Sequence, residues 1–460
     1  MEIKNKSFIC LLAGIAAFFI LKVFEMQFKF SDGYTYMYMG KLILNGLVPY
    51  KDFFFASPPF QIYFLSFFEI FFGKNIILLK FIPIVAVIGS SIFIYLFMKK
   101  KFGEWQGLTA SLLFLFSFLV LLTTDYLTGI SVTTFFILGM AYFIEEDKPF
   151  VAGVFGSLAL LTRLYSPFPI AGALVYYIIY KRKEILKFVI GLLSLFLPVS
   201  IFFQIISNGN YLSQIFFFRL NLISGIGLSK LSVVWFFLVG DFVLILGSLF
   251  WLLFDKEKKK LTLPVLMTFV SIIFYVVYSD IYYLYFGLII GFLSMFSAKF
   301  LFEFSDFKNF KKVLVALLVI LILFNSFLYI QNHASSANIT FTNDIVNFVK
   351  NNSNSSDTIY GSFELTPLIG ILSERKLAGN IADTNPKNIM ISAYNLQDLE
   401  KKIAGVKFII SKVNILPDGE IADFDASTPL DYINKNCNLT KTYNIEKDYS
   451  SNAVVIFECK

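Results

Sequence analysis

The sequence predicts a polytopic α-helical membrane protein of about eleven transmembrane helices with a small α/β domain at its C-terminus. Mean hydropathy is +0.72 and only 15% of the 460 residues are charged, whereas soluble domains carry about 25% charged residues. The apolar residues form blocks long enough to cross a bilayer, which takes about 20 helical residues. Near Asn332 these blocks give way to Asn, Ser, Asp and Lys. We therefore expect a membrane domain over residues 1–331 and a soluble domain over residues 332–460.

Each expected span is a block of apolar residues bounded by polar or charged ones. The first block is predicted to be a retained helix. Its apolar run from Phe8 to Phe28 exceeds the about 7–15 residues of a signal peptide, and no small-residue cleavage site follows. The expected spans are residues 7–28, 76–98, 106–123, 128–144, 150–164, 167–180, 187–206, 232–254, 261–278, 282–302 and 313–331.

Basic residues cluster on alternate loops between the expected spans. Short loops rich in Lys and Arg stay in the cytoplasm, so these loops mark the inner side of the membrane. An odd number of spans then makes the N-terminus cytoplasmic and the C-terminal domain extracytoplasmic. The long segments 29–75 and 207–231 also fall on the outer side, which favours an enzyme of the outer face over a simple channel. The basic clusters are Lys4 and Lys6, Lys99–Lys101, Lys148, Lys181–Lys183, Lys256 with Lys258–Lys260, and Lys308 with Lys311–Lys312.

The distribution of charge argues against a nucleic-acid partner. The net charge of +7 would suit an anionic ligand. However, the segment 332–460 contains 15 acidic and 12 basic residues, and most of the remaining basic residues lie in short inner loops. His333 is the only histidine, and no Cys-x-x-Cys motif or Gly-rich phosphate loop is present on the inner side. We expect no metal site, no cofactor and no nucleic acid, and the lipid bilayer as the surrounding medium.

Helical and strand-like runs alternate in the C-terminal segment, which predicts a small α/β domain. The helical runs are Asn343–Asn351 and Leu396–Ile403, and the strand-like runs are Thr358–Gly361, Val406–Ile410 and Ala453–Phe457. Cys437 and Cys459 both lie in this domain, outside the cytoplasm, and are expected in a terminal hairpin, where they could form a disulfide or remain two free thiols.

Two carboxylates are expected at the outer membrane face, and they are the candidate catalytic residues. Asp32 directly follows the first span and begins an amphipathic helix, and Asp125 occupies the tight outer turn Thr123–Leu127. Asp32 could serve only as a solvated helix N-cap. An uncharged turn would suffice to join two spans, however, so two acids at one membrane level favour a shared pocket. A carboxylate there can accept the proton of a hydroxyl group.

Arg163 is the best candidate for binding a phosphate. It stands at the outer end of a span, and a guanidinium group matches the geometry of a phosphate. The alternative is that its side chain only extends to the water interface. Arg219 and Lys230, in the outer segment 207–231, are weaker candidates of the same kind. Asp241 lies within an apolar block, and we expect it to face protein or a polar cavity outside the active site.

The first outer segment carries a distinctive motif: Asp32-Gly33-Tyr34, then Gly46-Leu47-Val48-Pro49-Tyr50-Lys51-Asp52-Phe53, then Pro58-Pro59. This motif resembles the GT-C glycosyltransferases, most closely the protein mannosyltransferase-like family 39 and the lipid A sugar transferases. Asp125 is similar to an acid in the second outer loop of that family, and Leu160–Arg163 resembles its Leu-Thr-Lys segment. The run Asp280–Tyr285 resembles its His-Tyr-Leu-Leu-Pro motif without the His and Pro. Gly33 stands where the family carries Glu.

The resemblance implies an inverting glycosyltransferase that moves a sugar from a polyprenyl-phosphate donor to a hydroxyl group of a glycan, lipid or protein. Asp32 would remove the proton of the acceptor, and Asp125 would orient the acceptor or hold Asp32. Arg163 would stabilise the charge that builds on the departing phosphate. The remaining residues expected to bind substrate or phosphate are Tyr50, Asp52, Tyr165, Arg219, Lys230 and Tyr282, although the tyrosines could simply anchor the protein at the membrane interface.

Two other classes of protein remain open from the sequence. One is a transporter or lipid flippase, and the other is a non-catalytic membrane protein or an oligosaccharide polymerase. A transporter would show inverted repeats with interrupted spans in matching halves. The sequence has no such symmetry, so the enzyme is the preferred hypothesis.

Overall fold

The computed structural model describes all residues except 1–5, 25, 27, 74, 218–228, 256, 279–280, 303–308, 336–340, 387, 389–395, 419, 425–427 and 446–450. The chain forms two compact units. The first unit comprises residues 1–26, 80–201 and 227–331, and the second comprises residues 27–79, 202–226 and 332–460. The first outer segment and the second long outer segment of the prediction thus fold largely with the C-terminal segment, in the second unit.

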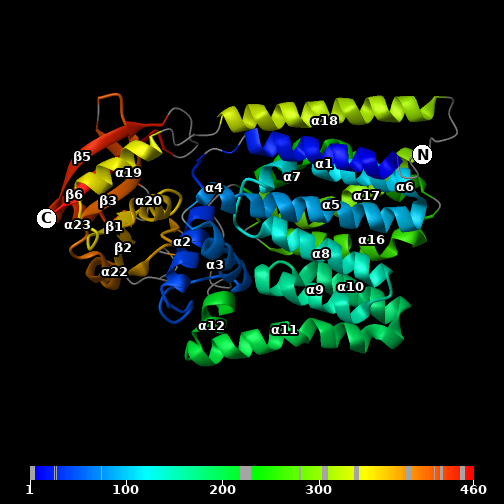
Figure 1. Ribbon diagram of the computed structural model, residues 1–460, viewed down its shortest axis with the longest axis horizontal. Helices are drawn as coiled ribbons and strands as arrows, with labels where there is room; N and C mark the ends of the chain where they lie inside the picture. The colour runs from blue at the N-terminus through cyan, green and yellow to red at the C-terminus, as the bar shows by residue number, and fades with distance from the viewer. Residues whose placement is uncertain are drawn as a thin grey trace. The chain divides into compact units, whose positions relative to one another are not determined.

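The first unit is built entirely from helices in its described residues (Figure 1). Two of the boundaries between the units fall within helices, one in α11 (Ile185–Ile206) and one in α18 (Phe310–Ser335). The other helices of the unit are α1 (Lys6–Phe24), α5 (Phe81–Phe102), α6 (Glu104–Leu115), α7 (Phe118–Thr123), α8 (Ile130–Glu145), α9 (Pro149–Thr162), α10 (Pro167–Tyr180), α14 (Lys230–Gly240), α15 (Phe242–Phe254), α16 (Thr262–Val277) and α17 (Gly287–Leu301).

Six helical segments among the described residues are long and apolar enough to cross a membrane. A seventh span results if α14 and α15, which meet at an angle of 85°, are counted as one broken helix. The six are Lys6–Phe24, Ile76–Phe102, Arg182–Ile206, Lys258–Val277, Tyr283–Leu301 and Lys312–Gln331. The chain is a multi-pass membrane protein.

All eleven predicted spans coincide with a helix or an interrupted helix, but four of them fall short of a full membrane crossing by length. The predicted span 106–123 is divided into α6 and α7, and α8, α9 and α10 have 16, 14 and 14 residues. Since about 20 residues cross the hydrocarbon layer, the structure supports six or seven spans, and the count of eleven stays a prediction.

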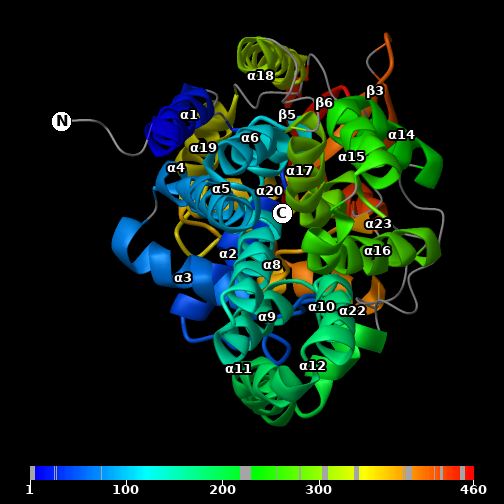
Figure 2. The same ribbon diagram turned by 90° about the vertical axis from the view of Figure 1, so that its right-hand side faces the viewer.

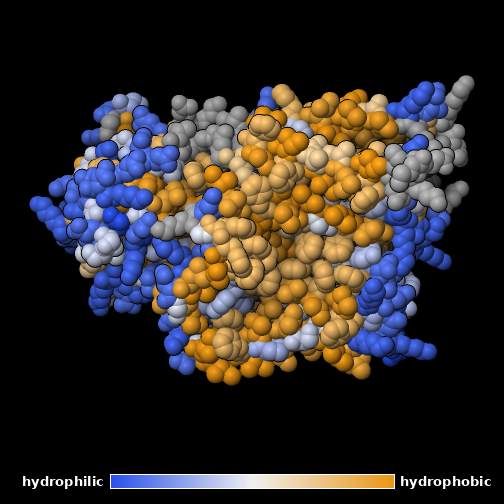
Figure 3. Space-filling view, viewed as in Figure 1, coloured by the Kyte–Doolittle hydropathy of each residue, from blue (hydrophilic) through white to orange (hydrophobic). Residues whose placement is uncertain are grey.

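The outer surface of the helices in the first unit is apolar, as expected for a surface that faces lipid (Figure 3). Along α18, for example, Ile320 is 62% exposed and Leu323 is 64% exposed. By contrast, the span that contains α17 is 78% buried, because α6, α8 and α15 pack around it (Figure 2). The bundle therefore has an apolar interior and an apolar exterior, the distribution of a membrane-embedded helix bundle.

Glycines allow two helices of this bundle to approach closely. A Cβ atom at Gly153 of α9 would lie 2.2 Å from the carbonyl oxygen of Phe188 in α11. Similarly, a Cβ atom at Gly191 of α11 would lie 2.2 Å from the carbonyl oxygen of Phe150 in α9. Small residues at facing positions are the usual means by which membrane helices pack without a hydrophobic driving force between them.

The second unit contains a six-stranded mixed sheet with the order β2-β1-β3-β6-β5, and β4 pairs with β3. Pairing is parallel for β2–β1 and β1–β3, and antiparallel for β3–β4, β3–β6 and β6–β5. The strands are β1 (Thr358–Gly361), β2 (Lys376–Leu377), β3 (Phe408–Ile415), β4 (Ile421–Phe424), β5 (Cys437–Asn444) and β6 (Ala453–Cys459). The helices that accompany the sheet are α19 (Thr342–Asn351), α20 (Thr366–Ser373), α22 (Leu396–Ile403) and α23 (Leu430–Asn436).

The first outer segment contributes α2 (Gly33–Leu44), α3 (Phe60–Phe72) and α4 (Ile76–Leu79) to the second unit, and α12 (Asn210–Leu212) comes from the other long outer segment. Helix α2 packs on α20 and α3. The hydroxyl group of Thr35 donates to the carbonyl oxygen of Phe363 at 3.0 Å, and the amide of Leu377 donates to the hydroxyl oxygen of Tyr38 at 2.7 Å. The start of the first outer segment is thus fastened to the C-terminal α/β fold.

The predicted elements of the C-terminal segment are present, and two further strands and two further helices join them. The ranges Thr358–Gly361 and Leu396–Ile403 agree with β1 and α22, and the other three runs differ by a few residues. The expected terminal hairpin is formed by β5 and β6. The strands β2 and β4 and the helices α20 and α23 were not predicted. Cys437 and Cys459 face each other on β5 and β6 and form a disulfide bond, which decides between the two alternatives left open by the sequence.

Candidate active site

Asp125 lies in the turn after α7, where a partly buried ion pair fixes its carboxylate. The ammonium group of Lys22 on α1 contacts Asp125 Oδ1, and the hydroxyl group of Tyr329 on α18 lies 2.9 Å from Oδ1 and 3.1 Å from Oδ2. Lys22 also donates to the Tyr329 oxygen at 2.7 Å and to the carbonyl oxygen of Leu121 at 2.9 Å. The Lys22 side chain is 2% exposed and that of Asp125 is 20% exposed. Three helices distant in sequence therefore hold the orientation of one candidate catalytic acid.

The short helix α7, which leads to Asp125, is secured at its N-terminus by two long-range contacts. Asp241, at the break between α14 and α15, accepts hydrogen bonds from the backbone amides of Phe118 and Leu119 at 3.0 Å each. The Asn325 amide donates to the carbonyl oxygen of Phe116 at 2.7 Å. The expectation that Asp241 faces protein and not substrate is correct, because its carboxylate satisfies helix amides that would otherwise lack partners.

A series of tyrosine contacts joins the Asp125 turn to the end of α9. The Tyr126 and Tyr283 hydroxyl groups are 3.5 Å apart, and the rings of Tyr282 and Tyr283 are 4.3 Å apart. Tyr285 follows in the same 3-10 turn, η4 (Tyr283–Phe286), and its ring lies 4.5 Å from that of Tyr165. Tyr126 follows Asp125, and Tyr165 lies two residues after Arg163. These contacts therefore bring together the Asp125 turn, the segment after Arg163 and the run Tyr282–Tyr285, which are three of the segments that the sequence analysis selected.

Arg163 ends α9 and is only 7% exposed. The hydroxyl group of Ser166 donates to its backbone carbonyl oxygen at 2.7 Å, which fixes the chain directly after the helix. A side chain enclosed to this extent does not fit the alternative in which Arg163 merely extends to the water interface. Lys230 differs from Arg163 in that its ammonium group holds the end of a helix. It donates to the carbonyl oxygen of Val276, in the last turn of α16, and at 3.0 Å to that of Tyr278, directly after the helix. The predicted site residue Arg219 lies outside the described residues.

Asp32 belongs to the second unit and is exposed. It occupies the N-cap position of α2, but its carboxylate makes no capping hydrogen bond. Instead, the Ser31 hydroxyl oxygen accepts the Gly33 amide at 3.0 Å. The expectation that Asp32 begins a helix is correct, and the alternative in which its carboxylate caps that helix is not supported.

Glu364 and Lys412 lie beside the segment that carries Asp32, and no sequence motif marks either residue. The Ser31 amide donates to the Glu364 carbonyl oxygen at 3.3 Å. Lys412 Nζ is 2.7 Å from the Glu364 carboxylate and 4.6 Å from the centre of the Phe30 ring. Lys412 belongs to β3 and Glu364 precedes α20, so a partly buried ion pair of the C-terminal fold supports the start of the first outer segment. Only their position in the folded unit distinguishes these residues from the other charges of the domain.

Tyr50 and Asp52 shape the first outer segment. Tyr50 is 1% exposed and has a φ angle of 68°, and its hydroxyl group donates to the Ser57 carbonyl oxygen at 2.7 Å. Burial raises the pKa of Tyr50 well above its usual value, so the phenol remains neutral. Asp52 Oδ2 accepts the Val48 amide at 2.7 Å. Both side chains thus hold a turn of the backbone.

The sequence model of the dolichyl-phosphate-mannose-protein mannosyltransferases matches residues 56–206 of this chain. The match includes Asp125 and Arg163, and it begins after Asp32 and Asp52. Among solved structures, ArnT from Cupriavidus metallidurans in the apo state has a TM-score of 0.66 at 12% identity, over 97% of each chain. The chain has the GT-C glycosyltransferase fold.

Further similar structures include two that were solved with a lipid phosphate. ArnT from the same organism bound to undecaprenyl phosphate gives a TM-score of 0.63 at 12% identity, over 97% of each chain. The oligosaccharyltransferase of Archaeoglobus fulgidus in the apo form gives 0.60 at 11% identity, over 89% of this chain and 70% of that one. A structure of that organism's AglB with an inhibitory peptide and a dolichol-phosphate gives 0.54 at 11% identity, over 94% and 75%. No curated protein sequence matches at a significant level.

Proposed function

We propose that this GT-C protein is an inverting glycosyltransferase that uses a polyprenyl-phosphate sugar and works at the outer face of the membrane. The observation that carries this proposal is the agreement of the fold along 97% of the chain with ArnT, which was solved with undecaprenyl phosphate. The match of residues 56–206 to the mannosyltransferase model points to the same chemistry. The acceptor is a hydroxyl group of a glycan, lipid or protein.

The proposed reaction is a single displacement at the anomeric carbon of the donor sugar. The acceptor oxygen bonds to this carbon while the bond to the phosphate oxygen breaks, and polyprenyl phosphate leaves with the bonding electrons. Asp32 takes the proton of the acceptor hydroxyl group, which raises the nucleophilicity of the oxygen. Its carboxylate is exposed at the start of α2, where an acceptor hydroxyl group can reach it.

Arg163 binds the phosphate of the donor in this proposal and stabilises the charge that develops as it departs. Asp125 orients the acceptor, since its carboxylate has a fixed direction through Lys22 and Tyr329. Tyr165 and Tyr282 surround the donor. Lys230 binds backbone carbonyl groups at the C-terminal end of α16 and so supports the donor side. Tyr50 and Asp52 shape the first outer segment on the acceptor side. Arg219 is a further candidate for the phosphate.

We also propose that the N-terminus lies in the cytoplasm and the second unit outside it. The basic clusters on alternate loops support this orientation. The disulfide between Cys437 and Cys459 supports it as well, because disulfides persist in oxidising compartments. Protease added to intact cells should therefore cleave the C-terminal segment, and cleavage that occurs only after the membrane is permeabilised would contradict this orientation.

The direct test is sugar transfer by the purified protein in proteoliposomes with a panel of radiolabelled polyprenyl-phosphate sugars and envelope extracts as acceptors. We expect label to appear in product together with an equal amount of polyprenyl phosphate. The variant Arg163→Met should bind the donor more weakly and transfer less. Movement of intact donor between leaflets without any transfer would contradict the proposal and favour a flippase.

A further inference from the structure

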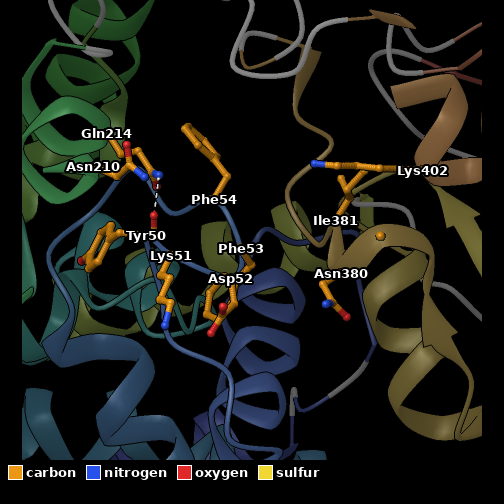
Figure 4. A pocket seen from close by; sticks show the side chains of 11 residues that line it. Tyr50, Lys51, Asp52, Phe53, Phe54, Asn210, Gln214, Asn380, Ile381 and Lys402 are labelled. Carbon is orange, nitrogen blue, oxygen red and sulfur yellow. Dashed lines mark hydrogen bonds between the residues drawn. The ribbon is translucent and has the colours of Figure 1, made fainter. Parts of the chain in front are cut away.

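A polar pocket of about 210 Å³ lies wholly within the second unit. Three segments far apart in the sequence form it: the turn Tyr50–Phe54, the region of α12, and the turn before Ile381 with the adjoining α22 (Figure 4). The residues that line it are Tyr50, Lys51, Asp52, Phe53, Phe54, Asn210, Gln214, Gly379, Asn380, Ile381 and Lys402. None of the reaction steps proposed above uses Asn210, Asn380 or Lys402.

The wall formed by the first outer segment is held firmly. Gln214 accepts the Phe55 amide at 2.9 Å and donates to the Tyr50 carbonyl oxygen at 3.1 Å. The ring of Tyr50 packs at 5.0 Å from that of Tyr211. Both polar ends of the Gln214 amide are used in this way, so this side of the pocket is preformed and keeps its shape without a ligand.

Lys402 is directed across the pocket toward Phe54 (Figure 4). Its aliphatic stem lies against Gly379, where an added Cβ atom would be 2.9 Å from Lys402 Cβ. Gly379 has a φ angle of 58°, a conformation that favours glycine. The stem can lie flat there only because no side chain intervenes, so the backbone fixes the direction of an exposed cation.

Free polar groups accompany this cation. Lys51 is a second exposed lysine, and Asn210 and Asn380 add two amide groups that make no side-chain hydrogen bond with the residues described by the structure. Asp52 is the only acid in the lining, and one of its oxygens is occupied by the Val48 amide. The pocket therefore offers two cations, two amides able to donate and accept, and one partly used carboxylate.

Phe54 supplies an apolar surface in the midst of these polar groups. It is half-buried and packs against the hydrophobic core of the C-terminal sheet domain, which includes Ile381 and Ile403. A sugar ring presents apolar C–H groups on its faces and hydroxyl groups at its edge, so an aromatic ring surrounded by amides is suited to it. Two cations beside that ring suit a sugar that carries a carboxylate or phosphate group.

We propose that this pocket binds an anionic sugar unit of the acceptor, a uronic acid or a phosphorylated sugar. This inference rests on the proposed glycosyltransferase function, because only a transferase has an acceptor that the pocket could bind. Lys402 binds the anionic group, Asn210 and Asn380 bind hydroxyl groups, and the ring packs on Phe54. Recognition of a charged sugar away from the reacting hydroxyl group would select the acceptor without taking part in the chemistry.

The test is saturation-transfer NMR on the full-length protein in detergent with glucose 6-phosphate, glucuronate and glucose as probes. Both anionic sugars should bind, and glucose about tenfold more weakly. Lys402→Met keeps the length of the stem and removes the charge, and Asn380→Asp adds an acid of the same size. Each variant should weaken binding of the anionic sugars about tenfold, and Lys402→Met should leave the binding of glucose unchanged. Lys401→Met, the exposed neighbour on α22, is the matched control and should behave as wild type.

Glucose that binds as well as the anionic sugars would overturn the proposal, and so would unchanged binding in both pocket variants. Complete competition by inorganic phosphate at the concentration of glucose 6-phosphate would show an anion site without sugar recognition, which also overturns it. Sugar transfer by the wild type combined with binding that is insensitive to Lys402→Met contradicts this proposal alone. Binding that is sensitive to Lys402→Met, with no transfer from any polyprenyl-phosphate donor, contradicts only the proposed function.

Discussion

Lys22 of α1 and Asp125, more than a hundred residues later in the turn after α7, form a partly buried ion pair, and the hydroxyl group of Tyr329 on α18 contacts both partners. A lysine in an apolar helix is costly unless it is paired. The pair therefore explains how Lys22 is accommodated, and it gives the Asp125 carboxylate a fixed direction.

Replacing Lys22 with Met should destabilise the protein by about 1–3 kcal/mol, because the largely enclosed Asp125 carboxylate loses its charged partner. Thermal unfolding of the detergent-solubilised protein would measure the change. The double variant Lys22→Met, Asp125→Asn should recover much of that stability. Transfer activity should stay low in the double variant, because Asp125 also orients the acceptor. Recovery of both stability and transfer activity would show that the role of Asp125 is purely structural.

Asp241 should matter for activity without contacting substrate. Asp241→Asn places an amide donor opposite the amides of Phe118 and Leu119, so α7 should lose about 1–2 kcal/mol of N-terminal stabilisation. We expect a lower kcat with little change in the KM for the donor, because the displaced element carries Asp125 and leaves Arg163 in place. Ser117→Ala, which removes the side-chain oxygen that accepts the Val120 amide at the same end of α7, should have the same effect in milder form. A KM effect alone would contradict this positioning role.

Glu69 on α3 should make stability depend on pH. Burial raises the pKa of Glu69 from 4.5 to about 8, and nearby Lys41 partly offsets the shift. Between these two values the folded protein holds a proton that the unfolded chain has lost, so the stability contributed by Glu69 declines as pH rises from 4.5 toward 8.

Glu69→Gln removes this titration, and its unfolding temperature relative to wild type should therefore increase from acidic to alkaline pH. Thermal unfolding at about pH 5, 7 and 9 would measure the trend. Glu400→Gln, at an exposed position of α22, is the control and should follow wild type at every pH. A difference in unfolding temperature between Glu69→Gln and wild type that stays the same at every pH would contradict the raised pKa of Glu69.

The spans could be predicted because a bilayer imposes its requirement on each segment separately. An apolar block of sufficient length is visible without knowledge of its neighbours, so every predicted interval coincides with helix. The division of the predicted span 106–123 could not be seen, since neither Pro nor Gly marks Phe116 and Ser117. That break is stabilised by Asp241 and Asn325 from remote helices.

Contacts between distant residues account for the rest of what the sequence did not predict. Strand β4 (Ile421–Phe424) is short and has no buried residue, so only its pairing with β3 defines it. Lys22 was treated as part of an apolar span, and nothing near it indicates Asp125 as its partner. Asp32, Asp125 and Arg163 could be selected from the sequence because they are charged residues at the predicted outer ends of spans. Glu364, Lys412 and Lys402 could be recognised only from their positions in the folded structure.

The most direct test of the proposed mechanism is the single-turnover rate of sugar transfer by Asp32→Asn, measured with saturating polyprenyl-phosphate sugar. A general base contributes about 10²–10⁴ in rate, so we expect a loss of at least about a hundredfold with unchanged donor binding. Asp344→Asn, at an exposed position of α19, is the matched control and should transfer at the wild-type rate. A wild-type rate in Asp32→Asn would contradict the assignment of the catalytic base.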